Sequence, residues 1–333
     1  MKRIGYRTLE FENDCSIISY AGVVGPKEAQ GPLGKCFDRC FDDSILGQDS
    51  WEKAESILQK SAVSYALLKG DIKPEEIDVI FAGDLLNQCT ASSFGLMNFD
   101  IPFVGMYGAC STMALSLINA GIFVDCSAAQ KAIAVTSSHF CSAERQYRFP
   151  LEYGGVRPPS SQWTVTGSGA VIIGKDSDIK LNRCTIGKII DLGVTDSNNM
   201  GAAMAPAAAD TFKAYFKDTK TKPDDYDMIF TGDLGSIGTE LLYELIDKDG
   251  ISLRSNHKDC GNMIFDTEKQ DVHSGGSGCG CSASVLCAHI LPQMRDKKLN
   301  NILFCATGAL MSPTTVQQGE DIPTIAHIIN ITT

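Results

Sequence analysis

The sequence is short of positive charge. Its 333 residues include 29 lysines and arginines against 40 aspartates and glutamates, which gives a net charge of −11. No lysine- or arginine-rich run offsets this balance, so the positive field that draws proteins to nucleic acids is missing. We predict no nucleic-acid partner, and an anionic ligand would need a few local cations or backbone N–H groups.

The sequence also lacks a long hydrophobic run. Its most apolar helical stretch, residues 113–124, is too short and too interrupted to span a bilayer. The first residues contain two cations but no apolar core of the kind that follows them in a secretory signal. We therefore expect a cytoplasmic chain, with any membrane association being peripheral.

The thirteen cysteines lack the spacing of a metal site. The only close pair, Cys279 and Cys281, has C-x-C spacing, and no second cysteine or histidine pair accompanies it. Structural zinc sites need four ligands, usually in C-x-x-C pairs. We predict no bound metal, and we expect most of these thiols to be small buried side chains.

What the sequence does contain is an internal repeat. Residues 73–85 read KPEEIDVIFAGDL and residues 222–234 read KPDDYDMIFTGDL, with eight of thirteen positions identical at a constant offset of 149. A helical pattern precedes each copy, over residues 51–69 and 205–218. Downstream, GACSTMALSLINAG (108–121) corresponds to GCGCSASVLCAHIL (278–291), and each is followed by an apolar strand. The repeat predicts two related halves, 1–180 and 181–333.

Each half alternates helices and strands, which is typical of predominantly parallel sheets covered by helices. The segments 113–124 and 283–291 are apolar on nearly every face, so we expect them to lie between two sheets. Residues 167–173 and 324–332 would be the closing strands. The predicted fold class is α/β, with five layers in the order α-β-α-β-α.

Such a duplicated architecture, with Cys110 at the start of a buried helix, resembles the thiolase-like superfamily. Within it, the chain resembles the stage V sporulation protein AD family over nearly its full length. The strings that carry this resemblance are GPKEAQGPLG (25–34), AGDLLNQ (82–88), GACST (108–112), SSHFCSAERQYRFPLEYGG (137–155), VTGSGAV (165–171), DLGVTDSNNMGAAMAPAAADT (191–211), GGSGCGCSA (275–283) and ATGALMSPTT (306–315).

The resemblance implies a function in spore formation. The family is implicated in moving dipicolinic acid, pyridine-2,6-dicarboxylic acid, into the developing spore together with other SpoVA-operon proteins at the inner forespore membrane. The expectation is thus a dipicolinate-binding subunit that is associated peripherally with that membrane, forms a homodimer and is not an enzyme.

The catalytic alternative depends on partners for Cys110. A helix N-terminus favours a thiolate, and it also favours any other anion. Enzymes of this superfamily add a histidine, and a second histidine or asparagine, from the second half. The corresponding positions here hold Asp233 and Cys279, and an aspartate beside a thiol disfavours the thiolate. The alternative is a Cys110-dependent acyltransferase or ketoacyl synthase-like enzyme with His139 or His273 as its base.

The repeat-related Asp84 and Asp233 follow strand ends, where open α/β sheets place ligands. Each could instead cap its own loop by accepting hydrogen bonds from backbone N–H groups. Asp84 is the stronger candidate of the two, because its half also carries Cys110. An acidic side chain repels a dianion such as dipicolinate. A Ca²⁺ ion bound to dipicolinate would offset this repulsion, so the calcium chelate is also a candidate ligand.

Besides Cys110, Asp84, Asp233 and Cys279, the predicted ligand site contains four further residues. His139 follows the strand after the Cys110 helix and is expected to face the same pocket. Arg145, or Arg148, could hold a ligand carboxylate, or could pair with an acidic neighbour instead. The segment 256–265 is expected to be a loop over the pocket mouth, where Lys258 would be the cation and Cys260 a lining atom.

Overall fold

The computed structural model describes residues 1–147 and 156–333. Most of its strands join one continuous mixed sheet, in the order β12-β11-β14-β15-β10-β3-β9-β7-β5-β6. The sheet has two sections, one from each half of the chain, which meet where β10 pairs with β3 at Lys180 and Ser16. The section from the first half contains β3 (Ser16–Val24), β9 (Gly167–Gly174), β7 (Ala132–Ser138), β5 (Val79–Gly83) and β6 (Phe103–Gly105).

The section from the second half repeats this order. It contains β10 (Lys180–Thr185), β15 (Thr324–Thr332), β14 (Asn301–Ala309), β11 (Met228–Thr231) and β12 (His257–Asp259). Central strands such as β7, β9 and β14 are almost wholly buried, because helices cover both faces of each section.

The sheet is not predominantly parallel, although the sequence favoured that arrangement. The pairs β5–β6, β5–β7, β11–β12 and β11–β14 are parallel. The closing strands β9 and β15 run antiparallel to both of their neighbours. Alternation of strands and helices correctly predicted the crossovers, but it carries no information on the direction of a strand that closes a half.

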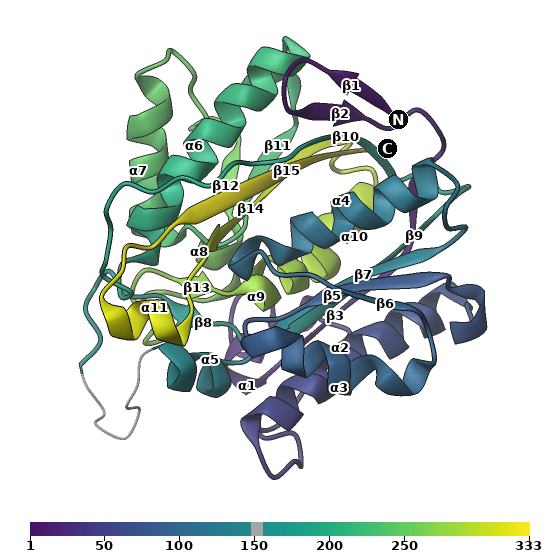
Figure 1. Ribbon diagram of the computed structural model, residues 1–333, viewed down its shortest axis with the longest axis horizontal. Coiled ribbons are helices and arrows are strands. Elements are labelled where there is room, and N and C mark those ends of the chain that lie inside the picture. Colours follow the sequence, from purple (N-terminus) through teal and green to yellow (C-terminus); the bar gives the residue numbers. More distant parts are fainter. Residues whose placement is uncertain (148–155) are drawn as a thin grey trace.

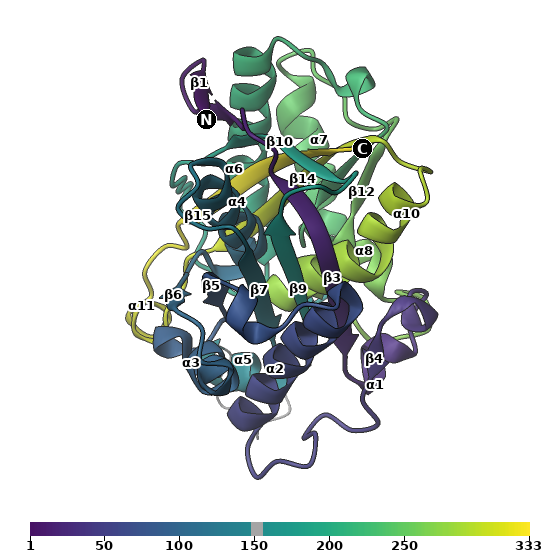
Figure 2. The same ribbon diagram turned by 90° about the vertical axis from the view of Figure 1, so that its right-hand side faces the viewer.

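Helices form three layers around the two sections (Figure 1, Figure 2). Outside the first section lie α2 (Trp51–Gly70) and α3 (Thr90–Leu96), and outside the second lie α6 (Met200–Thr219) and α7 (Gly235–Asp247). Between the sections lie α4 (Thr112–Asp125) and the segment formed by α9 (Cys279–Val285), a π-helical turn (Leu286–Ile290) and α10 (Leu291–Arg295). This arrangement confirms the predicted five layers.

Local sequence explains where the outer helices begin and end. Ser50 accepts a hydrogen bond from the backbone N–H of Lys53 at the start of α2, and Asp71 ends that helix in a left-handed conformation. Asn199 plays the same N-capping role for α6. The central helix α4 needs no polar face, because both sheet sections bury it.

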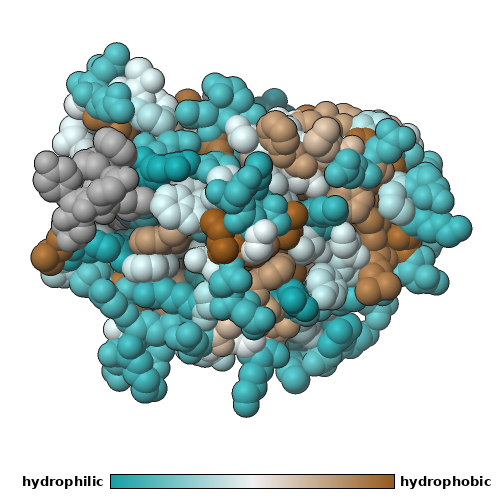
Figure 3. All heavy atoms as spheres, turned by 90° about the horizontal axis from the view of Figure 1, so that it is seen from below, coloured by the Kyte–Doolittle hydropathy of each residue, from teal (hydrophilic) through white to brown (hydrophobic). Residues whose placement is uncertain are grey.

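The smaller elements surround this frame. They are β1 (Lys2–Ile4), β2 (Thr8–Glu10), α1 (Pro26–Ala29), β4 (Arg39–Cys40), α5 (Phe140–Tyr147), β8 (Trp163–Thr164), α8 (Cys260–Ile264), β13 (Gly276–Ser277) and α11 (Pro313–Gln318). The face that carries α1, α2 and α5 is mainly hydrophilic, with hydrophobic side chains in its middle and toward one side (Figure 3).

Candidate functional site

Cys110 lies in a single 3₁₀ turn, Ala109–Ser111, directly before α4. Hydrogen bonds hold this turn: Ser111 Oγ donates to the carbonyl of Gly108 at 2.6 Å, and Thr112 Oγ1 to that of Ala109 at 2.6 Å. Ala109 has a positive φ of 49°, which is strained for a residue with a side chain. The turn is therefore fixed, and it holds Cys110 buried against the second half.

A small, partly open cavity of about 30 Å³ lies beside Cys110. Its wall combines apolar residues from both halves with a few polar ones, and no lysine or arginine is among its lining residues in the described part of the chain. The lining residues are Leu85, Ala109, Cys110, Ala143, Glu144, Tyr147, Thr164, Met200, Ser277, Ala309 and Met311. Space of this size holds a few water molecules.

Asp233 faces Cys110 from the second half. Its carboxylate accepts hydrogen bonds from the Gly278 backbone N–H at 2.8 Å and from Thr307 Oγ1 at 2.9 Å. It also accepts one from the Cys110 thiol. Burial nevertheless raises the pKa of Asp233 to about 7. Burial, and then the charge of Asp233, raise the pKa of the Cys110 thiol well above its usual value.

Cys279 lies in the same apolar cluster as Cys110, at the start of α9. Its thiol donates to the carbonyl oxygen of Ser137 at 2.9 Å. Burial raises the pKa of Cys279 well above its usual value, and the nearby Cys110 adds to the shift. The structure thus brings together Cys110, Asp233 and Cys279, and none of these three groups is a histidine.

None of the five histidines lines the cavity. His139, which was expected to face it, is buried elsewhere. Its Nδ1 accepts from the Cys141 backbone N–H at 3.1 Å, so its Nε2 carries the proton and donates to the carbonyl of Ser44 at 2.6 Å. Burial lowers the pKa of His139, which favours this neutral form. His273, the other candidate base, pairs with Asp271 at 3.3 Å.

The other three histidines have partners or positions away from the cavity. His257 contacts Thr231 and Tyr243, His327 accepts from a backbone N–H, and His289 lies in the π-helical turn. A histidine base for Cys110 is therefore not in place.

Asp84 is fully buried but does not line the cavity. One carboxylate oxygen accepts from the Leu86 backbone N–H at 2.8 Å, and the other from the Ser92 backbone N–H at 2.8 Å and Ser92 Oγ at 2.6 Å. These bonds hold the loop between β5 and α3. Asp84 thus has the contacts of the capping alternative, and of the two repeat-related aspartates it is Asp233 that lies beside Cys110.

The segment 256–265 is not a loop over the pocket mouth. Residues His257–Asp259 form the edge strand β12, which pairs with β11, and Cys260 begins α8. Lys258 is exposed on this strand, and Cys260 is fully buried in the core without lining the cavity. The pattern missed the strand because it is only three residues long.

Arg145 forms an ion pair with Glu52 and lies over the ring of Trp51. It therefore has an acidic partner, as the alternative to ligand binding required, but that partner is Glu52 and not the neighbouring Glu144. Glu152, the other acidic neighbour, lies outside the described residues. The other arginine considered, Arg148, lies outside the described residues.

A second, more open groove of about 190 Å³ adjoins the cavity. Leu85, Tyr147 and Met311 line both spaces, so they form the wall between them. The hydroxyl of Tyr147 donates to the carbonyl of Leu85 at 2.6 Å. The hydroxyl of Tyr107, which lines the groove, donates to the carbonyl of Met311 at 2.8 Å and so links the two halves.

Most of the lining was not predicted. Met200 and Met311 lie in two of the strings that carry the family resemblance (191–211 and 306–315), but they reach the cavity only through the folding of distant segments, so the strings did not mark them as lining residues. Tyr147 lies in the segment 137–155. The arginines of this segment suggested ligand binding, but its aromatic residues did not. Helix α5, which carries Tyr147, is held by Ser142 Oγ, which donates to the buried carboxylate of Glu55 at 2.8 Å.

The described residues contain no group of three or more histidine, cysteine, aspartate or glutamate side chains arranged to hold a metal ion. Among the same residues, no helix has both the length and the apolar character needed to cross a bilayer.

Known proteins share both the sequence pattern and the fold. The sequence profile of the family described as Stage V sporulation protein AD (SpoVAD) matches residues 5–332. The stage V sporulation protein AD of Bacillus subtilis (strain 168) is 48% identical over 328 residues, which are 98% of this chain and 97% of that protein.

Two solved structures share the fold. The 3-oxoacyl-[acyl-carrier-protein] synthase III of Aquifex aeolicus VF5 has a TM-score of 0.60 at 10% identity, covering 96% of this chain and 100% of that one. Cerulenin-bound OleA of Xanthomonas campestris has a TM-score of 0.62 at 15% identity, covering 98% of each chain. At these identities the likeness establishes a thiolase-like fold and nothing about activity.

Proposed function

Because the chain belongs to the stage V sporulation protein AD family, we propose that it binds dipicolinic acid without turning it over and serves dipicolinate uptake into the developing spore. The observation that carries the non-catalytic part is the environment of Cys110. Asp233 and Cys279 stand where a catalytic pair would stand, and the pKa of the Cys110 thiol is raised well above its usual value by burial and by Asp233. A thiol kept protonated is a poor nucleophile.

The proposed ligand site is the cavity beside Cys110, with Asp233 and Cys279 next to it. The positive end of the α4 helix dipole favours one carboxylate of the ligand there. Asp233, whose pKa is about 7, is partly protonated at neutral pH and can then donate a hydrogen bond to the ligand. The nearby acids also suit the calcium chelate, in which the ligand itself brings the cation.

At about 30 Å³, the cavity is too small for an aromatic ring with two carboxylates. Ligand access therefore requires the shared wall to move, so that the cavity joins the adjoining groove of about 190 Å³. The wall includes Tyr147, whose link to Leu85 is a single hydrogen bond from its hydroxyl. Such a bond contributes about 1 kcal/mol, which is small enough for repeated opening.

Titration calorimetry with dipicolinate, with and without Ca²⁺, tests this function. We expect binding by the native chain and a loss of about tenfold or more in affinity for Cys110→Leu, which fills the cavity. The matched control Cys126→Leu changes an exposed cysteine far from the cavity and should bind normally. Absence of binding at millimolar dipicolinate in both conditions would overturn the proposal.

The alternative function is acyl transfer through Cys110, and it is favoured only by the position of Cys110 before α4 in a fold that enzymes share. It predicts a covalent adduct after incubation with an acyl-CoA, seen as a mass increase of the intact protein and abolished by Cys110→Ser. Binding without turnover predicts no adduct.

We also propose that the protein acts as a homodimer with other SpoVA-operon proteins at the inner forespore membrane. The dimer is supported by β6, the outer strand of the sheet, and by the neighbouring α3. Together with the 3₁₀ turn that follows α3 (Met97–Phe99), they expose four apolar side chains: Phe94 (66%), Met97 (67%), Phe103 (43%) and Val104 (37%). An unpaired apolar edge is suited to a second copy. Light scattering of the native chain and of Val104→Lys tests it, and a monomeric native chain contradicts it.

A further inference from the structure

A cationic groove lies far from Cys110 in the fold, between the β1–β2 hairpin and the chain that continues from β10. Its volume is about 440 Å³. The hairpin projects from one end of the molecule, beside α6 (Figure 1, Figure 2). The groove is lined by Arg3, Tyr6, Arg7, Leu9, Ile186, Gly187 and Lys188. Three of these seven residues are cations and none is an acid, although the chain as a whole carries a net charge of −11.

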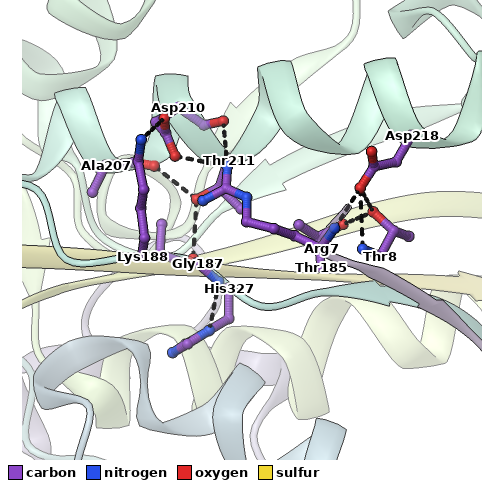
Figure 4. A network of polar contacts seen from close by, with 11 residues as sticks. Arg7, Thr8, Thr185, Gly187, Lys188, Ala207, Asp210, Thr211, Asp218 and His327 are labelled. Carbon is purple, nitrogen blue, oxygen red and sulfur yellow. Dashed lines mark hydrogen bonds and ion pairs between the residues drawn. The ribbon is translucent and has the colours of Figure 1, made fainter. Parts of the chain in front are cut away.

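Acidic residues fix the cations from the side of α6. Asp210 accepts from Arg7 through its carboxylate at 2.7 Å and through its backbone carbonyl at 3.1 Å, and it pairs with Lys188 at 3.1 Å. Figure 4 shows Arg7 and Lys188 both reaching Asp210. One aspartate therefore orients two cations, whose combined charge it does not neutralise.

The backbone of the hairpin is held in a similar way. Asp218 accepts hydrogen bonds from the backbone N–H groups of Tyr6, Arg7 and Thr8 at 2.9, 2.8 and 3.1 Å. The carboxylate of Asp218 is therefore occupied by the backbone of the hairpin. The second guanidinium nitrogen of Arg7, Nη1, is buried and has no protein hydrogen-bond partner. A buried guanidinium N–H without an acceptor is unfavourable, so the position of Arg7 is held by Asp210 and not by a full set of protein acceptors.

Apolar side chains surround the same groove. Tyr6 is 78% exposed and Ile186 is 41% exposed. Just along the chain, Ile189 and Leu192 are 63% and 67% exposed. Cations combined with exposed apolar side chains are typical of surfaces that meet the headgroup region of a membrane.

We propose that this groove binds a phosphate-bearing anion, and that the phosphate belongs to an anionic lipid headgroup. Two arginines and a lysine match the charge and the several acceptor oxygens of a phosphate, and arginine binds it through paired N–H groups. The exposed Ile189 and Leu192 then contact the lipid around the headgroup. The proposal does not depend on dipicolinate binding, because no residue of this groove lines the Cys110 cavity.

Co-sedimentation with vesicles tests the proposal. The vesicles contain phosphatidylglycerol mixed with phosphatidylcholine, or phosphatidylcholine alone. We expect the native chain to bind the anionic vesicles more tightly, and Arg3→Ala/Lys188→Ala to bind them roughly thirtyfold more weakly, since each cation near an anionic surface contributes about 1 kcal/mol. Both side chains are exposed, so the fold should survive their loss.

The matched control is Lys60→Ala/Lys248→Ala, which removes the same charge from two exposed lysines outside the groove. It should bind anionic vesicles like the native chain. Calorimetry with glycerol phosphate, run in parallel, distinguishes a lipid from a free phosphate compound as the source. Ile189→Ser/Leu192→Ser should weaken vesicle binding and leave glycerol phosphate binding unchanged.

Binding of glycerol phosphate alone, lost in Arg3→Ala/Lys188→Ala, would support the groove as a phosphate site and assign it to a free phosphate compound. The proposal is overturned if neither probe binds, or if the groove variant and the control variant bind anionic vesicles equally well.

Discussion

The ends of the repeat-related strands β5 and β11 share the same sequence, but their aspartates make different contacts. Gly-Asp-Leu begins at the last residue of β5 in the first half and directly after β11 in the second, and both aspartates are fully buried. Asp84 accepts three hydrogen bonds from its own loop and from Ser92. Asp233 crosses to the central layer, where it contacts Cys110, Gly278 and Thr307. One aspartate holds a loop, and the other belongs to the candidate site.

The difference comes from the helix that succeeds each strand. In the first half, α3 presents Ser92 to Asp84. In the second half, the chain enters α7 almost at once, and the first N–H groups there are capped by Asp259, which accepts from Leu234 at 2.8 Å and Gly235 at 3.0 Å. Asp233 is thereby free to face the other half. A duplicated motif therefore does not imply a duplicated role.

The largest expected effect concerns the pH dependence that Asp233 imparts. Its pKa is raised from 3.8 to about 7 in the folded chain, so the folded state binds more protons than the unfolded state between these values. The contribution of this raised pKa to the free energy of unfolding is fully present below about pH 3.8, and it is lost as the pH rises through about 7. Asparagine does not titrate, so Asp233→Asn should lose less stability than the native chain between pH 4 and pH 8. The expected difference is up to about 4 kcal/mol in the free energy of unfolding.

An exposed control, Asp224→Asn, should follow the pH profile of the native chain. An unchanged profile for Asp233→Asn would mean that Asp233 is ionised throughout, and that the contrast with Asp84 is only one of position.

The next largest effect is on stability at Asp84. Asp84→Ala leaves the buried donors of Leu86 and Ser92 without acceptors, so we expect a loss of about 3 kcal/mol in the free energy of unfolding. Urea denaturation measures it. Dipicolinate affinity of the folded fraction should be retained. Normal stability together with lost binding would instead restore Asp84 to the ligand site.

A smaller effect is expected on the reactivity of Cys110. Asp233→Asn removes the charge that disfavours the thiolate, so alkylation of Cys110 by iodoacetamide at pH 8 should speed up about tenfold. Asp84→Asn is the matched control at the repeat-related position and should leave the rate unchanged. Peptide mass spectrometry assigns the alkylated cysteine, and equal rates in both variants would contradict the contact between Asp233 and Cys110.

The smallest effect concerns the link between the halves at the groove beside the Cys110 cavity. Tyr107→Phe removes the hydrogen bond to the carbonyl of Met311, worth about 1 kcal/mol. Dipicolinate association should become a few-fold faster in stopped-flow measurements, with little change in overall stability. Slower or unchanged association would show that the ligand reaches the cavity without crossing this contact.

Much of the fold could be predicted from the sequence. The periodicity predicted α2 and α6, and the uniformly apolar segments predicted α4 and the α9–α10 segment between the sheet sections. Local patterns of this kind depend on burial alone. Strand direction, and the three-residue strand β12, depend on pairing with distant strands, and the sequence patterns missed both.

The same distinction between local patterns and long-range contacts applies to the candidate site. The sequence by itself determined that Cys110 precedes a buried helix, and the repeat together with the resemblance to thiolase-like enzymes led to the prediction that Asp233 and Cys279 lie near it. Only the tertiary structure decided that Asp233 and not Asp84 meets the thiol, and that His139 bonds to Ser44 instead of facing the cavity. Side-chain direction at a strand end depends on which donors the folded chain supplies nearby, and those donors come from segments that no local pattern connects.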